Sequence, residues 1–377
     1  MQETYIFSAP GRTELGGNHT DHQRGCVLAA AVDLETTAQV QLNSTNIIRV
    51  FSEGYAPVEV QLDDLEIHAG EENTTAALVR GVAAEFVRRG AELQGFDAFV
   101  RSTVLPGSGL SSSAAFEVLL GTIFNELFFD KSLSPAEVAR IGQFAEYVYF
   151  GKPCGLMDQM ASAVGGMVFI DFEYPACPVV ERIDFDLAAA GYALCINDTG
   201  ADHADLTAEY AAIPGEMRKI CQYFGKDVLR QIPKMEFFAA LPQLRGRVPD
   251  RAILRAIHFY HENERAQQQA EALRAGDVDA FLALVRRSGR SSWMYLQNIT
   301  PAGAVEQQAV AVALALCEEL LDGRGACRVH GGGFAGTVQA FVPMDLLEHF
   351  RAGVEAVLGA GKCHVLSVRS AGGVRVK

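Results

Sequence analysis

A glycine- and serine-rich segment at residues 106–115, Pro-Gly-Ser-Gly-Leu-Ser-Ser-Ser-Ala-Ala, joins a predicted strand to a predicted helix. Glycines let the backbone approach a ligand closely, the free N–H groups at a helix start attract anions, and serine hydroxyls suit phosphate or magnesium. The segment predicts a phosphate site, and the alternative is a serine-capped helix. It has neither Walker nor dinucleotide spacing. The candidate contacts are Gly107, Ser108, Gly109, Leu110, Ser111, Ser112 and Ser113.

A polar cluster at residues 9–22, expected to be a loop between two strands, contains Arg12, Glu14, Asn18, His19 and Asp21. Short polar groups gathered in one place suit a ligand with many hydroxyls. A carboxylate such as Asp21 can accept bonds from two adjacent hydroxyls, and the planar donors of Arg12 suit a carboxylate or phosphate. The alternative is that these side chains cap turns.

Asp158 stands in a largely apolar segment, residues 151–160, at the expected N-cap of a short helix. As a general base it would face a substrate hydroxyl, with Arg12 as the charge partner that favours its ionised form. The alternative is a simple helix cap. A run of three glycines at 331–333, between two predicted strands, suits either a hairpin or a loop that closes over a nucleotide.

The elements that must position these groups form a mixture of strands and helices without regular βαβ alternation, which predicts an α+β fold. Strands are expected at 5–8, 26–34, 36–42, 47–51, 58–62, 96–104, 167–172 and 192–197, and helices at 74–89, 111–129 and 134–150. Residues 206–298 are expected to be helical. The final part, with strands at 326–330, 337–342 and 363–368 and a helix at 344–358, suggests a small ferredoxin-like sheet with helices on one face.

The bulk properties exclude several classes of function. A chain of 377 residues with 49% hydrophobic residues predicts two domains, placed at 1–195 and 196–377. The net charge of -14 argues against a nucleic-acid partner. The eight cysteines lack zinc spacing, and no basic leader or membrane-length apolar run is visible. We therefore expect a cytoplasmic enzyme without a membrane partner, as a monomer or weak homo-oligomer.

Taken together and in order, residues 11–21, 109–115, 154–159 and 331–336 resemble the galactokinase branch of the GHMP small-molecule kinases. The resemblance runs from about residue 7 to about residue 342, although roughly 220–320 carries no matching motif. It implies a GHMP kinase fold, with an N-terminal α+β domain (ribosomal protein S5 domain 2-like) and a ferredoxin-like C-terminal domain with added helices. ATP and sugar are then expected in the cleft between the domains.

The resemblance also implies roles for individual residues in an ATP- and Mg²⁺-dependent kinase acting on the anomeric hydroxyl of galactose. Asp158 corresponds to the catalytic aspartate, and Arg12 to the arginine that keeps it charged and stabilises the transferring phosphate. Ser113 and Glu146 correspond to the magnesium-associated pair, and Gly332 and Gly333 are expected at the nucleotide. The implied sugar contacts are Glu14, Asn18, His19, Asp21, Gly155 and Tyr210.

Four departures from the family pattern leave the substrate open. Galactokinases usually carry Glu at Asn18, Asn at Glu14, Tyr at His22 and Gly at Ala335. Without the Glu, a sugar carboxylate at C6 is not repelled, so galacturonate or another C6-modified galactose is an alternative substrate. A galactose- and ATP-binding regulator without turnover is an alternative of another class. The motifs argue against mevalonate and homoserine kinases.

Overall fold

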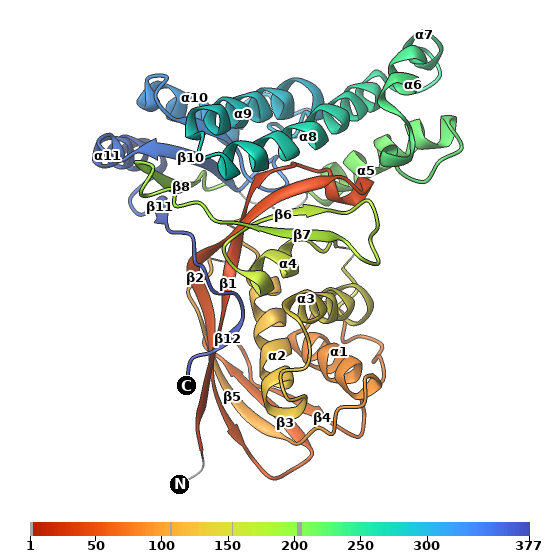
Figure 1. The fold of residues 1–377 in the computed structure, drawn as a ribbon, viewed down its shortest axis with the longest axis vertical. Helices are drawn as coiled ribbons and strands as arrows, with labels where there is room; N and C mark the ends of the chain where they lie inside the picture. Colours follow the sequence, from red (N-terminus) through yellow and green to blue (C-terminus); the bar gives the residue numbers. More distant parts are fainter. Residues whose placement is uncertain (1–2, 106–107, 153, 202–205) are drawn as a thin grey trace.

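The computed structural model describes residues 3–105, 108–152, 154–201 and 206–377. Their strands form one sheet of eight strands and one of four. Figure 1 shows the larger sheet with helices α1 to α4 in the lower half of the view, and the smaller sheet with most of the remaining helices above it. In the described part of the chain, we find no helix long and apolar enough to cross a membrane.

The larger sheet runs in the order β12, β1, β2, β5, β3, β4, and β6 and β7 extend it from the first half of β2. Residues 26–34 and 36–42 were expected as two strands but form one, because β2 pairs first with β6 and then with β5. The bounds are β1 Tyr5–Gly16, β2 Cys26–Leu42, β3 Ile47–Ser52, β4 Val58–Gln61, β5 Phe96–Ser102, β6 Met167–Asp171, β7 Val179–Ile183 and β12 Val374–Arg375.

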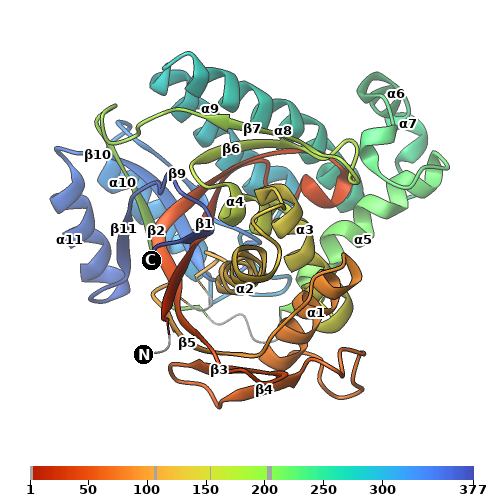
Figure 2. The same ribbon diagram turned by 60° about the horizontal axis from the view of Figure 1, so that its bottom comes forward.

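Four helices cover one face of this sheet, and in Figure 2 the strands from β1 to β4 curve around α2. Apolar side chains from the helices and the sheet share one core, in which Phe124 packs against Phe86 and Phe96 with ring centroids 5.4 and 5.6 Å apart. The predicted capping box at Ser134 is present. The bounds are α1 Thr75–Arg88, α2 Ser112–Phe128, α3 Pro135–Phe144 and α4 Met157–Val164, with a π-helical turn at Ala145–Tyr149 after α3.

The smaller sheet is antiparallel, in the order β11, β8, β10, β9, and helices cover both of its faces rather than the one expected. The reason lies in β10, which is buried throughout. Val338 and Ala340 pack with α10 and α11, whereas Phe341 packs on Phe281 of α9 at 5.2 Å. The bounds are β8 Tyr192–Asp198, β9 Ala326–Val329, β10 Thr337–Pro343, β11 Cys363–Leu366, α9 Val278–Ser291, α10 Ala309–Leu321 and α11 Leu347–Leu358.

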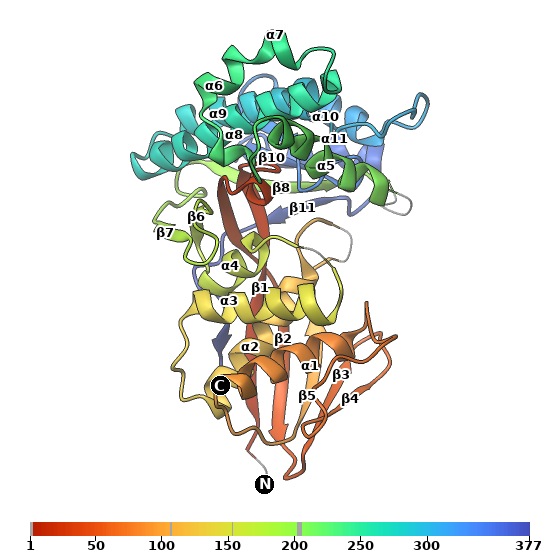
Figure 3. The ribbon, with the colours of Figure 1, turned by 90° about the vertical axis from the view of Figure 1, so that its right-hand side faces the viewer.

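The segment expected to be helical forms a layer at the far side of the smaller sheet, seen at the top of Figure 3. Besides α9, its helices are α5 Thr207–Tyr223, α6 Lys234–Ala239, α7 Leu241–Leu244 and α8 Asp250–Arg274. Short 3₁₀ turns lie at Asp21–Gln23 and Leu229–Gln231, and a second π-helical turn lies at Ser292–Leu296. Long α8 contacts β2, so this layer also reaches the larger sheet.

The predicted division at residue 195 stays a prediction. Residue 195 falls inside β8, which lies wholly in the smaller sheet. At the other end of the chain, β12 pairs with β1 in the larger sheet. The chain therefore crosses between the two sheets once before Tyr192 and again after Leu366.

Candidate active site

A bidentate ion pair joins Arg12 of β1 to Asp158 of α4. Nε of Arg12 donates to Oδ1 at 2.8 Å, and Nη2 donates to Oδ2 at 2.6 Å. Residues 9–16 are not the expected loop, because β1 continues to Gly16. The ladder between β1 and β2 is irregular between Pro10 and Arg12, and a bulge of this kind re-aims a side chain.

The arginine keeps Asp158 ionised. Burial raises the pKa of Asp158, but the charge and hydrogen bonds of Arg12, with a bond from Ser111, outweigh burial and hold the pKa below its usual value. The N-terminal end of α4 also favours a carboxylate. The predicted N-cap position is wrong, because the helix starts at Met157 and Leu156 is the cap residue. The Asp158 side chain keeps 31% of its surface exposed, so a substrate hydroxyl can reach it.

The serine-rich loop lies directly against this pair. Ser111 is the N-cap residue of α2 in a left-handed conformation, and its Oγ donates to Oδ2 of Asp158 at 2.7 Å. The carbonyls of Gly109 and Leu110 accept from the side chain and the backbone N–H of Arg12 respectively. The carbonyl of Ser108 accepts from Thr337 at 2.9 Å, which ties the loop to the smaller sheet. Gly107 lies outside the described residues.

A second carboxylate, Glu146 of the π-helical turn, lies against Ser113 in the first turn of α2. Ser113 donates to Oε1 of Glu146 at 3.1 Å, Lys152 donates to the same oxygen at 2.7 Å, and Gln159 donates to Oε2 at 2.8 Å. Gln159 also donates to buried Glu117 at 2.9 Å. Burial, and then the charge of Glu146, raises the pKa of Glu117 well above its usual value.

The donors around Glu146 fit a magnesium ion. Ser113 and Glu146 supply hard oxygen ligands, and Mg²⁺ commonly takes one or two protein ligands and completes its shell with phosphate oxygens and water. The ammonium of Lys152 already occupies the carboxylate as a stand-in cation. Among the described residues no larger cluster of His, Cys, Asp and Glu could hold a metal.

The polar loop after β1, residues 17–25, brings Asp21 next to Gly155 and His19 next to Gly332. A Cβ atom at Gly155 would lie 2.1 Å from Oδ2 of Asp21, so any larger residue there requires the Asp21 carboxylate to move. Burial lowers the pKa of His19 to about 4, and the neutral ring makes a 3.0 Å hydrogen bond with the carbonyl of Gly332. Burial raises the pKa of Asp21.

Glu14 and Asn18 lie deeper than the other predicted sugar contacts. Glu14 pairs with Arg328 of β9, and both side chains are nearly inaccessible. Asn18 donates to Glu14 at 3.2 Å and to the Gly331 carbonyl at 2.7 Å. Its Oδ1 accepts from Asn298 at 3.0 Å and from Ser292 at 3.3 Å. In this arrangement the amide of Asn18 has protein partners on every side, and its predicted sugar contact stays a prediction.

The glycine loop at 331–336 lies against the polar loop, to which it is joined by hydrogen bonds from Asn18 and His19. The hydroxyl of Tyr210 donates to the Gly333 carbonyl at 2.9 Å, and its ring fills the space that a Cβ at Gly332 would occupy. Asn298 also donates to the Gly332 carbonyl, at 3.2 Å. Tyr210, Gly332 and Gly333 thus meet at one place, beside His19, although more than 120 residues separate Tyr210 from the glycines in the sequence.

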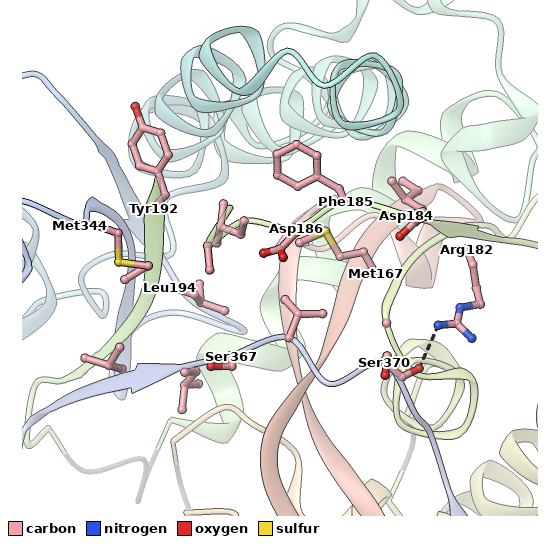
Figure 4. Close-up of a pocket in the computed structure, with 18 of the residues that line it drawn as sticks. Met167, Arg182, Asp184, Phe185, Asp186, Tyr192, Leu194, Met344, Ser367 and Ser370 are labelled. Atoms are coloured by element: carbon pink, nitrogen blue, oxygen red, sulfur yellow. Dashed lines mark hydrogen bonds between the residues drawn. The ribbon is translucent and has the colours of Figure 1, made fainter. Parts of the chain in front are cut away.

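A cavity of about 480 Å³ opens beside the serine loop. Its lining includes Ser112 and Ser113 together with Tyr55, Leu78 and Phe116. No motif marks the last three residues in the sequence, because they come from separate segments. A second cavity, of about 600 Å³, lies where the chain crosses between the sheets and includes Met167, Tyr192, Met344 and Ser370. Figure 4 shows this second cavity, which contains none of the predicted site residues.

Sequence reasoning named Ser113 as the partner of Glu146 but missed Lys152 and Gln159. Lys152 reaches Glu146 because the π-helical turn at Ala145–Tyr149 brings the backbone N–H of Lys152 within 3.1 Å of the Glu146 carbonyl. Such turns are frequent at functional sites, but the helical period does not reveal them. Gln159 could have been identified as a site residue from the sequence, because it directly follows Asp158.

Comparison with known proteins decides the family. The N-terminal domain of GHMP kinases matches residues 77–166, and the galactokinase galactose-binding signature matches residues 1–42. A galactokinase of Streptomyces coelicolor is 33% identical over 358 residues, which cover 94% of this chain and 87% of that protein. The chain belongs to the galactokinase family. The structure of Lactococcus lactis galactokinase complexed with galactose matches with a TM-score of 0.84 at 26% identity, over 99% of this chain and 95% of that one.

Membership of the galactokinase family confirms the resemblance, the kinase class of enzyme and the α+β GHMP kinase fold. A mevalonate kinase of Methanococcus jannaschii shares the fold at 14% identity, with a TM-score of 0.69 over 97% of this chain and 98% of that one. The matched galactokinase signature contains the ion-paired Arg12 and the whole polar loop, and the matched kinase domain contains Glu146 and Asp158.

Proposed function

We propose that this chain transfers the terminal phosphoryl group of ATP to the anomeric hydroxyl of galactose. One observation carries the proposal: the Arg12–Asp158 pair lies where the serine loop and the polar loop meet. A phosphate held by the serine loop and a sugar held by Asp21 therefore both approach Asp158. Phosphoryl transfer depends mainly on such positioning and on charge neutralisation.

Asp158 is the group that meets the attacking hydroxyl. Its lowered pKa keeps it a hydrogen-bond acceptor at neutral pH, so it orients the hydroxyl and receives its proton as the new bond to phosphorus forms. Arg12 has a second task in this arrangement. Its guanidinium fixes the carboxylate and places positive charge beside the serine loop, where negative charge on the transferring phosphate must be stabilised.

The remaining residues of the serine loop hold the nucleotide. Backbone N–H groups and hydroxyls from Ser108 to Ser113 are suited to the phosphates, and the apolar side chains that line the 480 Å³ cavity beside them, such as Leu78 and Phe116, suit the base. Ser113 and Glu146 would hold Mg²⁺, which when bound offsets the charge of the phosphates. The carbonyl of Gly332 is bonded to His19 of the polar loop and that of Gly333 to Tyr210 of α5, so we assign these glycines to closure of the site over its ligands.

Galactose is favoured over galacturonate by the surroundings of Asn18. A C6 carboxylate needs a free donor or cation, but both N–H bonds of Asn18 go to protein acceptors. The nearby cation Arg328 is already paired with Glu14. His19, Asp21, Gly155 and Tyr210 remain as the candidate sugar contacts. The reading as a regulator without turnover is disfavoured because Arg12 and Asp158 form an intact pair.

The cysteines bear on where the protein works. All eight lie in described residues, and all are free thiols, six of them buried. Free thiols are typical of reducing compartments, so we infer a cytoplasmic location. A monomer or weak homo-oligomer stays a prediction.

The test is a coupled ADP-release assay with Mg-ATP and, separately, galactose, galacturonate, N-acetylgalactosamine and glucose. We expect turnover to be highest with galactose. Asp158→Asn should lower kcat by roughly 10²- to 10⁴-fold, because the acceptor of the proton is lost, while ATP binding persists.

The matched control is Asp345→Asn, which removes an exposed bidentate pair with Arg324 and should leave kcat unchanged. Higher turnover with galacturonate than with galactose would show that the proposed substrate is wrong. Retained turnover in Asp158→Asn would remove this residue from the chemistry, and the absence of ADP release with every sugar would favour a binding protein.

A further inference from the structure

The ammonium of Lys152 lies on the carboxylate that we assign to the metal. Its Nζ is 2.7 Å from Oε1 of Glu146, the same oxygen that accepts the Ser113 hydroxyl at 3.1 Å. The other oxygen of Glu146 accepts from Gln159 at 2.8 Å. The side chain of Glu146 is 3% exposed, so neighbouring side chains, which include the thiol of Cys154, set its environment.

These bonds leave no room for an additional cation on Oε1. A carboxylate oxygen offers two lone pairs, and here one faces Ser113 and the other faces Lys152. The hydroxyl of Ser113 has lone pairs of its own and can become a metal ligand. An ammonium has none, and its charge repels a divalent ion. A metal ion that binds Glu146 through Oε1 must therefore displace Lys152.

The side chain of Lys152 can move away from Glu146 without a change in the backbone. Its side chain is 55% exposed, and its flexible stem allows the ammonium to move away while the backbone stays in place. The backbone N–H of Lys152 remains bonded to the Glu146 carbonyl at 3.1 Å. Because Gln159 holds Oε2 independently, the carboxylate keeps its orientation when the lysine leaves.

We propose that Lys152 is a resident counter-ion of Glu146 that competes with the divalent cation and so weakens metal-dependent nucleotide binding. It acts through Glu146, so it is a residue that sets metal affinity rather than a catalytic one. The inference rests on the proposed assignment of Ser113 and Glu146 to magnesium.

The test compares binding of adenylyl imidodiphosphate, a non-hydrolysable ATP analogue, in excess Mg²⁺ and in EDTA by isothermal titration calorimetry. The dissociation constant in EDTA divided by that in Mg²⁺ measures how much the metal strengthens nucleotide binding. Because a direct contact between lysine and phosphate affects both constants, it partly cancels in this ratio. In Lys152→Met, whose side chain is similar in length but uncharged, we expect this ratio to rise roughly two- to fivefold, the value of a partly exposed ion pair.

Two matched variants separate charge from structure. Lys152→Arg keeps the positive charge and should keep the wild-type ratio. Lys234→Met removes another lysine–glutamate pair of 2.7 Å, with Glu264, far along the chain from the site, and should also keep it. An unchanged or lower ratio in Lys152→Met would overturn the inference, as would an equal rise in Lys234→Met.

A further variant distinguishes this inference from the proposed function. Glu146→Gln should reduce the ratio strongly, because the metal loses its carboxylate ligand. If it does so while Lys152→Met has no effect, only the role of Lys152 is wrong. If Glu146→Gln leaves the ratio unchanged, the metal assignment fails and the role of Lys152 fails with it. Melting temperatures of the variants check that each is folded.

Discussion

Glu14 and Asn18 exchange a carboxylate and an amide relative to the usual galactokinase motif. The two side chains are in contact, with Nδ2 of Asn18 3.2 Å from Oε1 of Glu14, and Arg328 pairs with the carboxylate. The exchange therefore leaves positions 14 and 18 with one carboxylate in total, as in the usual motif, and that carboxylate is paired with Arg328. For the charge balance of this site, the total charge of residues 14 and 18 matters more than which of the two carries the carboxylate.

This balance predicts the cost of a single exchange. Asn18→Glu places a second carboxylate against Glu14, and the paired cation Arg328 already lies 3.9 Å from Glu262 as well. The free energy of unfolding should therefore fall by about 3 kcal/mol. The double variant Glu14→Asn with Asn18→Glu should recover at least half of that loss. Urea denaturation measures both.

Asn46→Glu, at an exposed position, serves as the control and should change the free energy of unfolding by less than about 0.5 kcal/mol. If the double variant is as unstable as the single one, the two side chains do not share one charge environment.

At the residue scale, the sequence predicted the chemistry of Arg12 and Asp158 and their pairing, because opposite charges in motifs of one family suggest contact. It did not predict the partners of Asn18. Ser292 and Asn298 are about 280 positions away in the sequence and carry no motif. Only the packing of the helical layer against the polar loop brings these amides and hydroxyls together.

At the scale of elements, the turn before α4 holds Gly155 against Asp21, and this contact leads to a prediction. Gly155→Ala puts a methyl group 2.1 Å from Oδ2 of Asp21, so that carboxylate must move. If Asp21 binds the sugar, KM for galactose should rise about tenfold, since a hydrogen bond to a charged group contributes about 1.5 kcal/mol or more. KM for ATP should change little. Steady-state kinetics measure both constants.

Gly215→Ala is the matched control, because nothing lies within 4 Å of a Cβ at that helical glycine of α5. It should leave both KM values unchanged and raise stability by up to about 1 kcal/mol. An unaltered KM for galactose in Gly155→Ala would argue against Asp21 as a sugar ligand.

Element prediction succeeded where local signals were strong. Helical spacing located α2, and the capping box at Ser134 marked the start of α3. It failed for β7 and β12, whose pairing partners decide their structure. The strand β7 exposes most of its residues and depends on β6, and two-residue β12 has no period at all.

At the scale of the whole molecule, the two sheets meet along a buried polar seam between β1 and the strands β9 and β10. Gln339 donates to Thr13 at 2.7 Å, and His330 lies 3.0 Å from the same hydroxyl and 2.9 Å from that of Thr337. The two predicted domains would meet at this seam. The boundary between them was difficult to place in the sequence, because no change in composition and no linker marks it.

The seam predicts a dependence of stability on pH through His330. Burial, then the charges of Arg12 and Arg328, lowers the pKa of His330 to about 3. The unfolded chain takes up this proton near pH 6.5, whereas the folded protein does not. The stabilisation from neutral His330 is therefore complete above pH 6.5 and is lost as the pH falls from 6.5 to about 3.

His330→Gln, which cannot ionise, should reduce the pH slope of the free energy of unfolding by about 1.4 kcal/mol per unit below pH 6.5. Urea denaturation of both proteins at pH 7.5, 6.0 and 5.0 gives this difference in slope, and other titrating groups cancel in the comparison. Parallel slopes would mean that His330 is not held neutral in the folded protein.

The pairing of β12 with β1 also joins the segments of the larger sheet that are synthesised first and last. Residues near Phe7 are synthesised first, yet their outer neighbours, Val374 and Arg375, are synthesised only after the whole smaller sheet. A nascent chain that folds the larger sheet on the ribosome therefore does so with the hydrogen-bonding groups of β1 open along one edge. Its outermost strand, β12, can be added only after the smaller sheet has been synthesised.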